Sequence, residues 1–162
     1  MGHCIRAIVA ASEIADCLQS ACPGLPRAVA RRNFAIFPVD ADFIDSVTEA
    51  RPPQSTNPLI LLTDAFQDLL RELSRFGPLA YIETDYFGGV GGQGAAVYSD
   101  GRVMMEPEWS KSGPINRALS GPINRALKMI GVRRGLFEDR FSALGLGEYR
   151  DNDDLIDAAA KG

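Results

Sequence analysis

Residues 78–105 read PLAYIETDYFGGVGGQGAAVYSDGRVMM, and they place two apolar, strand-like runs on either side of a cluster of glycines. The second run is interrupted by Asp100-Gly101. This dipeptide readily takes the positive backbone angles of a two-residue hairpin turn. Successive strands joined in this way predict a three-stranded antiparallel meander in the second half of the chain.

The segments before the meander supply further strands and helices. Residues 4–10, CIRAIVA, and residues 33–39, NFAIFPV, have the apolar content of short strands. Asp40 or Asp42 can cap a short helix, and residues 59–77 carry apolar side chains at three- and four-residue spacings typical of an amphipathic helix. We therefore expect an α+β fold, with one antiparallel or mixed sheet and helices packed mainly on one face. A doubly wound α/β fold is the alternative.

The length and composition indicate one domain. The chain has 162 residues, of which 46% are hydrophobic and 23% charged, and this is enough apolar material for a single core. We assign residues 1–150 to one globular domain. The remaining residues, 151–162, are acidic and poor in apolar side chains, so they are predicted to form a frayed helix or a disordered tail.

The charge and the cysteines restrict the environment and the partners. A net charge of -4 argues against nonspecific binding to nucleic acid or to an anionic membrane, unless charge is locally segregated. No apolar run is long enough to cross a bilayer, and Arg6 and Glu13 interrupt the segment that a signal peptide would need. Cys4, Cys17 and Cys22 have no CxxC spacing, so we interpret them as small buried side chains. We expect a cytoplasmic protein.

One eight-residue unit, SGPINRAL, occurs twice in succession, at residues 112–119 and 120–127. A proline inside a helix costs about 3 kcal/mol, so one straight helix is not expected to run through both copies. Only the second copy continues an apolar periodicity, and it predicts a helix from about Pro122 to Ile130. The first copy is expected to form a separate turn or bulged loop. We interpret the repeat as a recent in-frame duplication, natural or introduced.

The duplicated region and the residues that follow it are basic. A helix N-terminus combined with several cations could hold a phosphate or a carboxylate. The alternative is a solvated helix face opposite acidic parts of the same chain. The candidate anion-binding residues are Arg117, Arg125, Lys128, Arg133 and Arg134.

The glycine-rich segment does not match a nucleotide-binding motif. GGVGGQG lacks the Lys-Ser/Thr of a P-loop, and an apolar strand follows it where a dinucleotide fingerprint needs a helix. The glycines could form a bulged connection between strands, or a loop whose backbone lets a partner approach closely. Strand alternation places Tyr81, Glu83 and Asp85 on one face, which predicts an acidic, aromatic surface on the meander.

These patterns give two sets of candidate residues. A carboxylate pair could act as general acid and base or hold a divalent cation, so Glu83 and Asp85, with Gln93, are candidate catalytic residues. However, the chain has one histidine, His3, and no GxSxG motif, so we favour a function without catalysis. No cofactor and no metal site are assigned. The candidate binding residues are Tyr81, Glu83, Asp85, Tyr86, Gly89, Gly91, Gly92 and Gln93.

The run AYIETDYFGGVGGQGAAVY, followed by GPINRALKMIGV, resembles a pattern found in small stand-alone bacterial proteins of uncharacterised function. The resemblance covers about the central third of the chain and implies no known activity. In its acidic charge and its size, the chain is also similar in character to immunity proteins that neutralise toxins.

We therefore expect a cytosolic protein-binding module, of an immunity-like or inhibitory kind, that uses the acidic aromatic hairpin and the glycine-rich loop. The alternative is a small hydrolase or transferase with a Glu/Asp pair, with or without a metal. The expected partner is a protein rather than nucleic acid or a membrane, and a homodimer formed through an open sheet edge is a third hypothesis.

Overall fold

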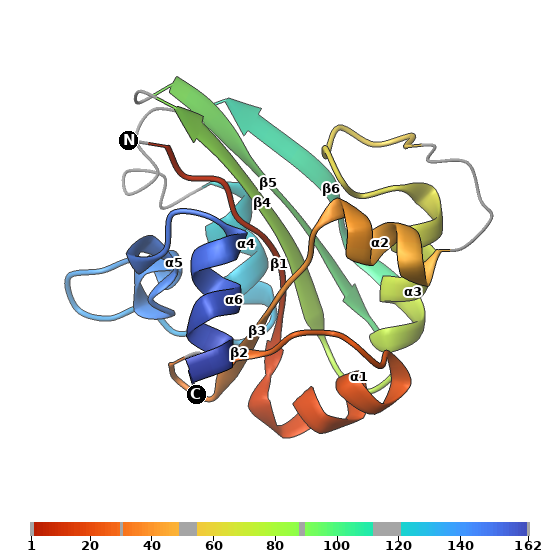
Figure 1. The fold of residues 1–162 in the computed structure, drawn as a ribbon. Helices are drawn as coiled ribbons and strands as arrows, with labels where there is room; N and C mark the ends of the chain where they lie inside the picture. The colour runs from red at the N-terminus through yellow and green to blue at the C-terminus, as the bar shows by residue number, and fades with distance from the viewer. Residues whose placement is uncertain (1, 30, 49–54, 88–89, 112–120, 162) are drawn as a thin grey trace.

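The computed structural model describes residues 2–29, 31–48, 55–87, 90–111 and 121–161. In these residues, one antiparallel sheet of six strands has the order β2-β3-β1-β4-β5-β6. Helices cover this sheet (Figure 1). The fold class is α+β, as predicted. The strands are β1 (Arg6–Ala11), β2 (Ala28–Val29), β3 (Phe34–Pro38), β4 (Leu79–Phe87), β5 (Val90–Ser99) and β6 (Arg102–Lys111).

The predicted meander is confirmed as β4, β5 and β6. Leu79 pairs with Tyr98 at one end of the first hairpin, and Phe87 pairs with Val90 at the other. Asp100 and Gly101 join β5 to β6 with positive φ angles of 52° and 75°. This is the backbone conformation that the Asp-Gly pair predicts.

Local signals locate most of the helices. The Asp40 side chain accepts a hydrogen bond from the Phe43 amide, and the Thr63 side chain does the same for Phe66. The second copy of the duplicated unit forms a helix from Pro122, as predicted, and the first copy lies outside the described residues. The helices are α1 (Ala15–Ala21), α2 (Ala41–Val47), α3 (Asp64–Leu73), α4 (Pro122–Met129), α5 (Arg140–Ala143) and α6 (Asn152–Lys161), with short 3-10 turns at Ser12–Ile14 and Leu146–Glu148.

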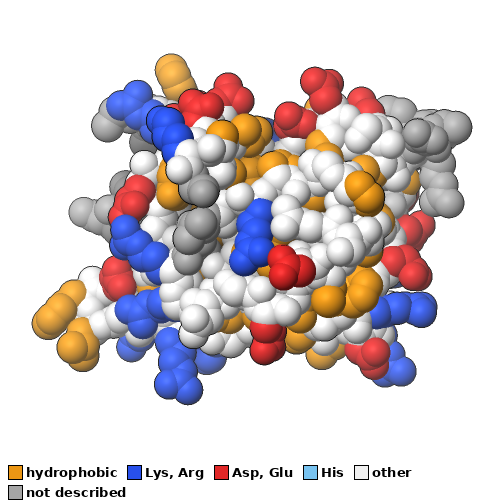
Figure 2. Space-filling view, turned by 60° about the horizontal axis from the view of Figure 1, so that its bottom comes forward, with side chains coloured by type: hydrophobic (Ala, Val, Ile, Leu, Met, Phe, Trp, Pro, Cys, Tyr) orange, Lys and Arg blue, Asp and Glu red, His pale blue; other side chains and the backbone are white. Residues whose placement is uncertain are grey.

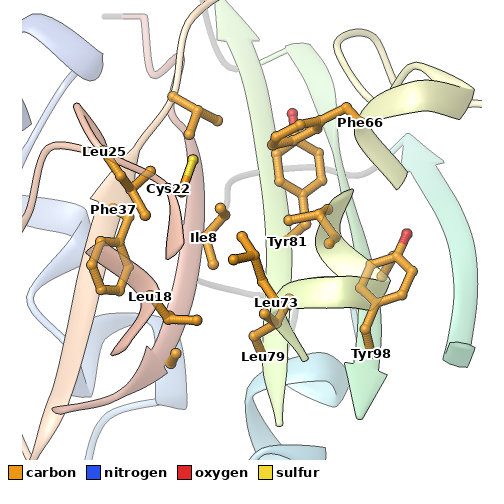
Figure 3. Packing of buried hydrophobic residues seen from close by; sticks show 14 of the residues in the cluster. Ile8, Leu18, Cys22, Leu25, Phe37, Phe66, Leu73, Leu79, Tyr81 and Tyr98 are labelled. Atoms are coloured by element: carbon orange, nitrogen blue, oxygen red, sulfur yellow. The ribbon is translucent and has the colours of Figure 1, made fainter. Parts of the chain in front are cut away.

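The helices are divided between the two faces of the sheet instead of gathering mainly on one (Figure 1). On the first face, α1, α2 and α3 pack over Ile8, Phe37, Tyr81 and Tyr98 (Figure 3). On the second face, α4, α5 and α6 cover the alternate side chains, including Val9. The central strands are apolar on both sides, so each side requires a cover.

The C-terminal segment differs from the frayed or disordered tail expected from its composition. It forms α6, and Leu155 is completely buried in the second core. The Asn152 side chain accepts a hydrogen bond from the Arg6 amide and donates one to the Val39 carbonyl. These long-range bonds and one buried leucine attach the segment to β1 and to the residue after β3, which local composition does not reveal.

The cysteines are less uniform than expected. Only Cys22 is buried, Cys4 is half-buried and Cys17 is exposed, and all three are free thiols. No helix in the described part of the chain combines the length and apolarity needed to cross a membrane.

Candidate functional site

Glu83, a candidate catalytic carboxylate, is completely buried on the first face of the sheet. One carboxylate oxygen accepts a 2.6 Å hydrogen bond from the Ile60 amide. The other accepts bonds from the Leu61 amide and the Tyr81 hydroxyl, both at 2.7 Å. Because both oxygens are engaged, Glu83 fixes the segment before α3 to the sheet instead of facing a substrate.

Tyr81 belongs to the same buried network. Its ring is completely buried and meets Phe66 edge-on at 5.6 Å between ring centroids. Burial, followed by the nearby Glu83 carboxylate, raises the pKa of Tyr81 well above its usual value. The hydroxyl therefore remains protonated and donates to Glu83, and it is not part of an exposed binding surface.

The three candidate catalytic residues do not converge. Gln93 is buried on the opposite face from Glu83, where its side chain donates to the Tyr86 hydroxyl at 3.3 Å. Its oxygen accepts a 3.1 Å bond from the Ile123 amide. Asp85 is exposed on the face of Glu83. No single substrate could therefore contact Glu83 and Gln93 together, since adjacent positions along paired strands face opposite sides.

The glycine-rich segment is a strand and not a loop from Val90 onward. A Cβ at Gly92 would stand 2.7 Å from the Trp109 indole, and one at Gly94 would stand 2.8 Å from it. The indole therefore lies against the bare backbone of two alternate glycines on the first face. Gly91 has a φ of 153°, and a Cβ there would clash with the Asp85 carbonyl. These glycines allow close packing within the sheet.

The predicted acidic aromatic surface is therefore mostly interior. Tyr86, Gly92 and Gln93 are buried, as are Tyr81 and Glu83. Of the eight candidate binding residues, Asp85 is exposed, Gly91 is half-buried and Gly89 lies outside the described residues. The prediction of exposure was wrong for the five buried residues, because segments distant in sequence cover both faces of this hairpin.

A smaller surface remains at the far end of the hairpin, where the ends of β4 and β5 extend beyond the helices (Figure 1). Phe87 is 82% exposed and Val90 76% exposed, and the two residues are direct cross-strand partners. Strand alternation places Asp85 and the partly buried Trp109 on the same face. Ile60, 48% exposed, lies above Glu83. We call these five residues, Ile60, Asp85, Phe87, Val90 and Trp109, the hairpin-end surface.

The described residues at the start of α4 do not form the candidate anion site. Pro122 has no amide hydrogen, and the Ile123 amide donates to Gln93. Arg125 forms an ion pair with Glu108, in agreement with a helix face opposite acidic parts of the same chain. Lys128, Arg133 and Arg134 are exposed, and Arg117 lies outside the described residues.

A pocket of about 390 Å³, which the sequence did not predict, lies between β1, α2 and α6. The Arg6 guanidinium lines it and donates to the Cys4 thiol at 2.9 Å, while the Arg6 Nε is buried without a hydrogen-bond partner among the described residues. Asp40 and Asp151 on its wall cap α2 and α6. No sequence signal joins these residues, because their positions are far apart in the chain.

His3 is held within the structure. One ring nitrogen lies 2.7 Å from the Thr84 hydroxyl and the other 3.3 Å from the Leu146 carbonyl. Burial lowers the pKa of His3, and the Leu146 carbonyl and Asp151 partly offset that effect. The imidazole thus ties the N-terminal segment to β4 and to the Leu146–Glu148 turn.

Comparisons of the chain with protein families, with curated proteins and with solved structures find no match. The resemblance to small bacterial proteins therefore stays a prediction. Within the described ranges, no group of three or more His, Cys, Asp or Glu side chains is arranged to hold a metal ion.

Proposed function

We propose that this protein is a cytosolic protein-binding module and that it contacts its partner through the hairpin-end surface. The observation that carries the proposal is the exposed cross-strand pair at the tip of the hairpin, Phe87 at 82% and Val90 at 76%. Large apolar side chains exposed together commonly mark interaction sites.

The strands below the pair form a rigid support. β4 and β5 are paired without interruption from Leu79–Tyr98 to Phe87–Val90, and the lower part of both strands is buried between two cores. A rigid support reduces the entropy lost on binding. Burial of each tip side chain in a partner would contribute about 1.5–3 kcal/mol. Together they could anchor a weak or moderate complex.

Trp109 adds a large aromatic side chain to the hairpin-end surface. Its indole lies over the strand at Gly92 and Gly94, and it remains only partly buried. Tryptophan is enriched among the residues that dominate binding energy at protein interfaces. The glycines thus support binding indirectly, because they allow the indole to lie flat beside the exposed tip.

Asp85 supplies a negative charge to the same surface. It is exposed and stands between buried Glu83 and exposed Phe87 on β4. An acidic residue beside an apolar pair favours a partner that presents a basic rim around an apolar depression, and opposite charges accelerate encounter. In its specific form, the proposal is an immunity-like inhibitor that occupies the basic cleft of a partner.

The contacts of Glu83 and Gln93 weigh against the hydrolase or transferase alternative. Glu83 has both oxygens engaged by hydrogen bonds, and Gln93 is occupied on the opposite face. A general base must reach the proton that it removes, and neither side chain is placed to do so in this arrangement.

Capture experiments test the proposal. The unchanged protein and the Phe87→Ser/Val90→Ser variant are immobilised and exposed to lysate of the source cells, and retained proteins are identified and then titrated as purified components. We expect one specific partner whose affinity falls at least about tenfold in the variant, as expected from the loss of two buried apolar contacts.

Met104→Ser is the matched control, since Met104 is also a largely exposed apolar residue, on β6, and is not part of the hairpin-end surface. Circular dichroism should show that both variants fold. Equal capture by the unchanged protein and by the Phe87→Ser/Val90→Ser variant, or no retained partner at all, would refute the proposal.

A further inference from the structure

Two neighbouring apolar side chains project from the connection between α4 and α5. Leu136 is 95% exposed and Phe137 is 100% exposed, the highest values among the exposed large apolar residues of the described chain. Side chains exposed to this extent have no protein wall beside them, so the tip is convex. We call residues 133–137, which carry this tip, the Arg133–Phe137 loop.

The base of the loop is fixed on both sides. Val132 is buried, and its amide donates to the Leu127 carbonyl at 2.9 Å while its carbonyl accepts from Arg140 at 2.9 Å. On the other side, Asp139 is buried and caps α5. The apolar tip is therefore presented by anchored neighbours, and insertion of the tip would require little ordering of the chain.

Positive charge is concentrated at this loop despite the overall net charge of -4. The ten residues from Lys128 to Phe137 contain three basic side chains and no acidic one, and the carboxylate that follows them, Glu138, forms an ion pair with Arg32. Arg133 and Arg134 are exposed and form no ion pair with a described carboxylate. Met129, 48% exposed at the end of α4, adds apolar surface in the same stretch. The loop therefore carries a local cluster of positive charge that the net charge of the chain does not reveal.

We propose that the Arg133–Phe137 loop docks this protein on an anionic lipid bilayer, with Leu136 and Phe137 inserted below the headgroups and Arg133 and Arg134 bound to lipid phosphates. A bilayer offers an apolar layer directly beneath an anionic one, and the loop places an apolar tip directly beside two cations. Guanidinium groups also match phosphate oxygens in geometry.

The convexity of the tip favours a bilayer over a protein partner. A protein would need a preformed apolar pocket with an acidic rim, whereas lipid chains adapt to a projecting side chain. Two apolar residues and two arginines give reversible association, weaker than that of a lipid anchor. The proposal uses no residue of the hairpin-end surface, so the two proposals can fail separately.

Vesicle flotation tests the inference. The purified protein is mixed with phosphatidylcholine vesicles or with vesicles that also contain phosphatidylserine. We expect flotation with the phosphatidylserine vesicles only, and a severalfold loss of binding when salt is raised, because salt screens the arginines. In a Phe137→Trp variant, insertion should shift the tryptophan emission to shorter wavelength on the same vesicles.

Variants separate the two parts of the loop. Leu136→Ser/Phe137→Ser should lower vesicle binding about tenfold or more, and Arg133→Gln/Arg134→Gln should abolish the preference for phosphatidylserine. Phe87→Ser/Val90→Ser, which alters the other exposed apolar pair, is the matched control and should bind vesicles as the unchanged protein does. All of these residues are exposed, so the variants should fold, as circular dichroism can verify.

Three results would overturn the inference. These are no flotation with either vesicle, equal flotation with both, and flotation that Leu136→Ser/Phe137→Ser leaves unchanged. If vesicles do not bind but a purified protein partner binds through Leu136 and Phe137, the loop is a protein-docking element and the lipid proposal is wrong.

Discussion

Glu83 and Asp85 are two residues apart on one strand and share one face, yet their surroundings give them opposite tasks. Glu83 is completely buried and accepts three hydrogen bonds, whereas Asp85 is exposed near the hairpin tip. A buried carboxylate is tolerated when its oxygens are satisfied in this way. The segment at Ile60 and Leu61 covers Glu83 but leaves Asp85 exposed. Glu83 therefore has a structural role, whereas Asp85 is accessible to a partner.

Substitution of Glu83 tests this assignment. In Glu83→Gln, the side-chain amide group would face a backbone N–H that now donates to the carboxylate, so one buried donor would lose its acceptor. We expect the free energy of unfolding in urea to fall by about 1–3 kcal/mol. Asp85→Asn is the matched control and should change it by no more than about 0.5 kcal/mol. Equal effects of the two substitutions would contradict the structural role of Glu83.

For single residues, the sequence predicted the face of the strand but not the burial of the side chain. Strand alternation correctly placed Tyr81, Glu83 and Asp85 on one face, because that periodicity is a local property of the chain. It did not predict burial, because the amides of Ile60 and Leu61 that cover Glu83 come from more than twenty residues away. The function of Gly92 and Gly94 was hidden for the same reason, since the indole that fills their space comes from β6.

At the scale of elements, predictions succeeded where the signal lies within the element. The start of α2 was predicted from its capping aspartate, and the start of α4 from a proline at the first turn. A helix was one of the two expectations for residues 151–162, but the attachment of α6 to the core was not predicted. The stability of α6 depends on Leu155 in the second core and on Asn152 bonded to β1 and to Val39, and these contacts join opposite ends of the chain.

The duplicated segment gives a prediction about an element boundary. β6 ends at Lys111, which pairs with Gly92, and α4 is held at its start by the neighbouring residue Gln93. After deletion of residues 112–119, Ser120, Gly121 and Pro122 would still join Lys111 to Ile123. Three extended residues span about 10 Å, whereas adjacent strands lie about 5 Å apart. We therefore expect the shortened protein to fold.

Circular dichroism and urea unfolding measure the outcome of this deletion. The shortened protein should retain the far-ultraviolet spectrum, and its free energy of unfolding should stay within about 1 kcal/mol, because loop closure depends weakly on loop length. Because the two copies are identical, deletion of either copy gives the same chain. The contrasting variant therefore lacks both copies, residues 112–127, which removes most of α4 together with buried Ile123 and Leu127, and it should not fold. Insoluble protein from the first deletion would show that the segment has a structural task.

At the scale of the whole molecule, two separate cores lie on the two faces of one sheet, and the face of the molecule in Figure 2 is mixed in charge. Figure 2 shows acidic and basic side chains interspersed over one face instead of separated by sign. In both proposals, recognition would depend on small projecting features, namely the hairpin tip and the Arg133–Phe137 loop. Neither feature follows from composition, since both require the fold to leave specific apolar side chains uncovered.

The edge of the sheet decides whether a homodimer could form by strand pairing. Of the two edge strands in the described sheet, β2 has only two residues and β6 has ten, and the register of β6 with β5 shifts where Glu106 and Pro107 lie opposite Ala96. A bulge, a proline without an amide hydrogen and a charged neighbour all disfavour pairing with another edge. We therefore expect light scattering to give the monomer mass of 17.5 kDa at micromolar concentration.

The Pro107→Val variant tests whether Pro107 prevents edge-to-edge pairing of β6. The substitution restores a backbone N–H donor at the bulge and adds a side chain suited to strands. We expect its mean mass in light scattering to rise with concentration more steeply than that of the unchanged protein. Met104→Val is the matched control, since it adds a β-branched residue to the same strand without changing the number of donors. A dimer mass for the unchanged protein, or equal behaviour of the two variants, would show that β6 does not protect the sheet in this way.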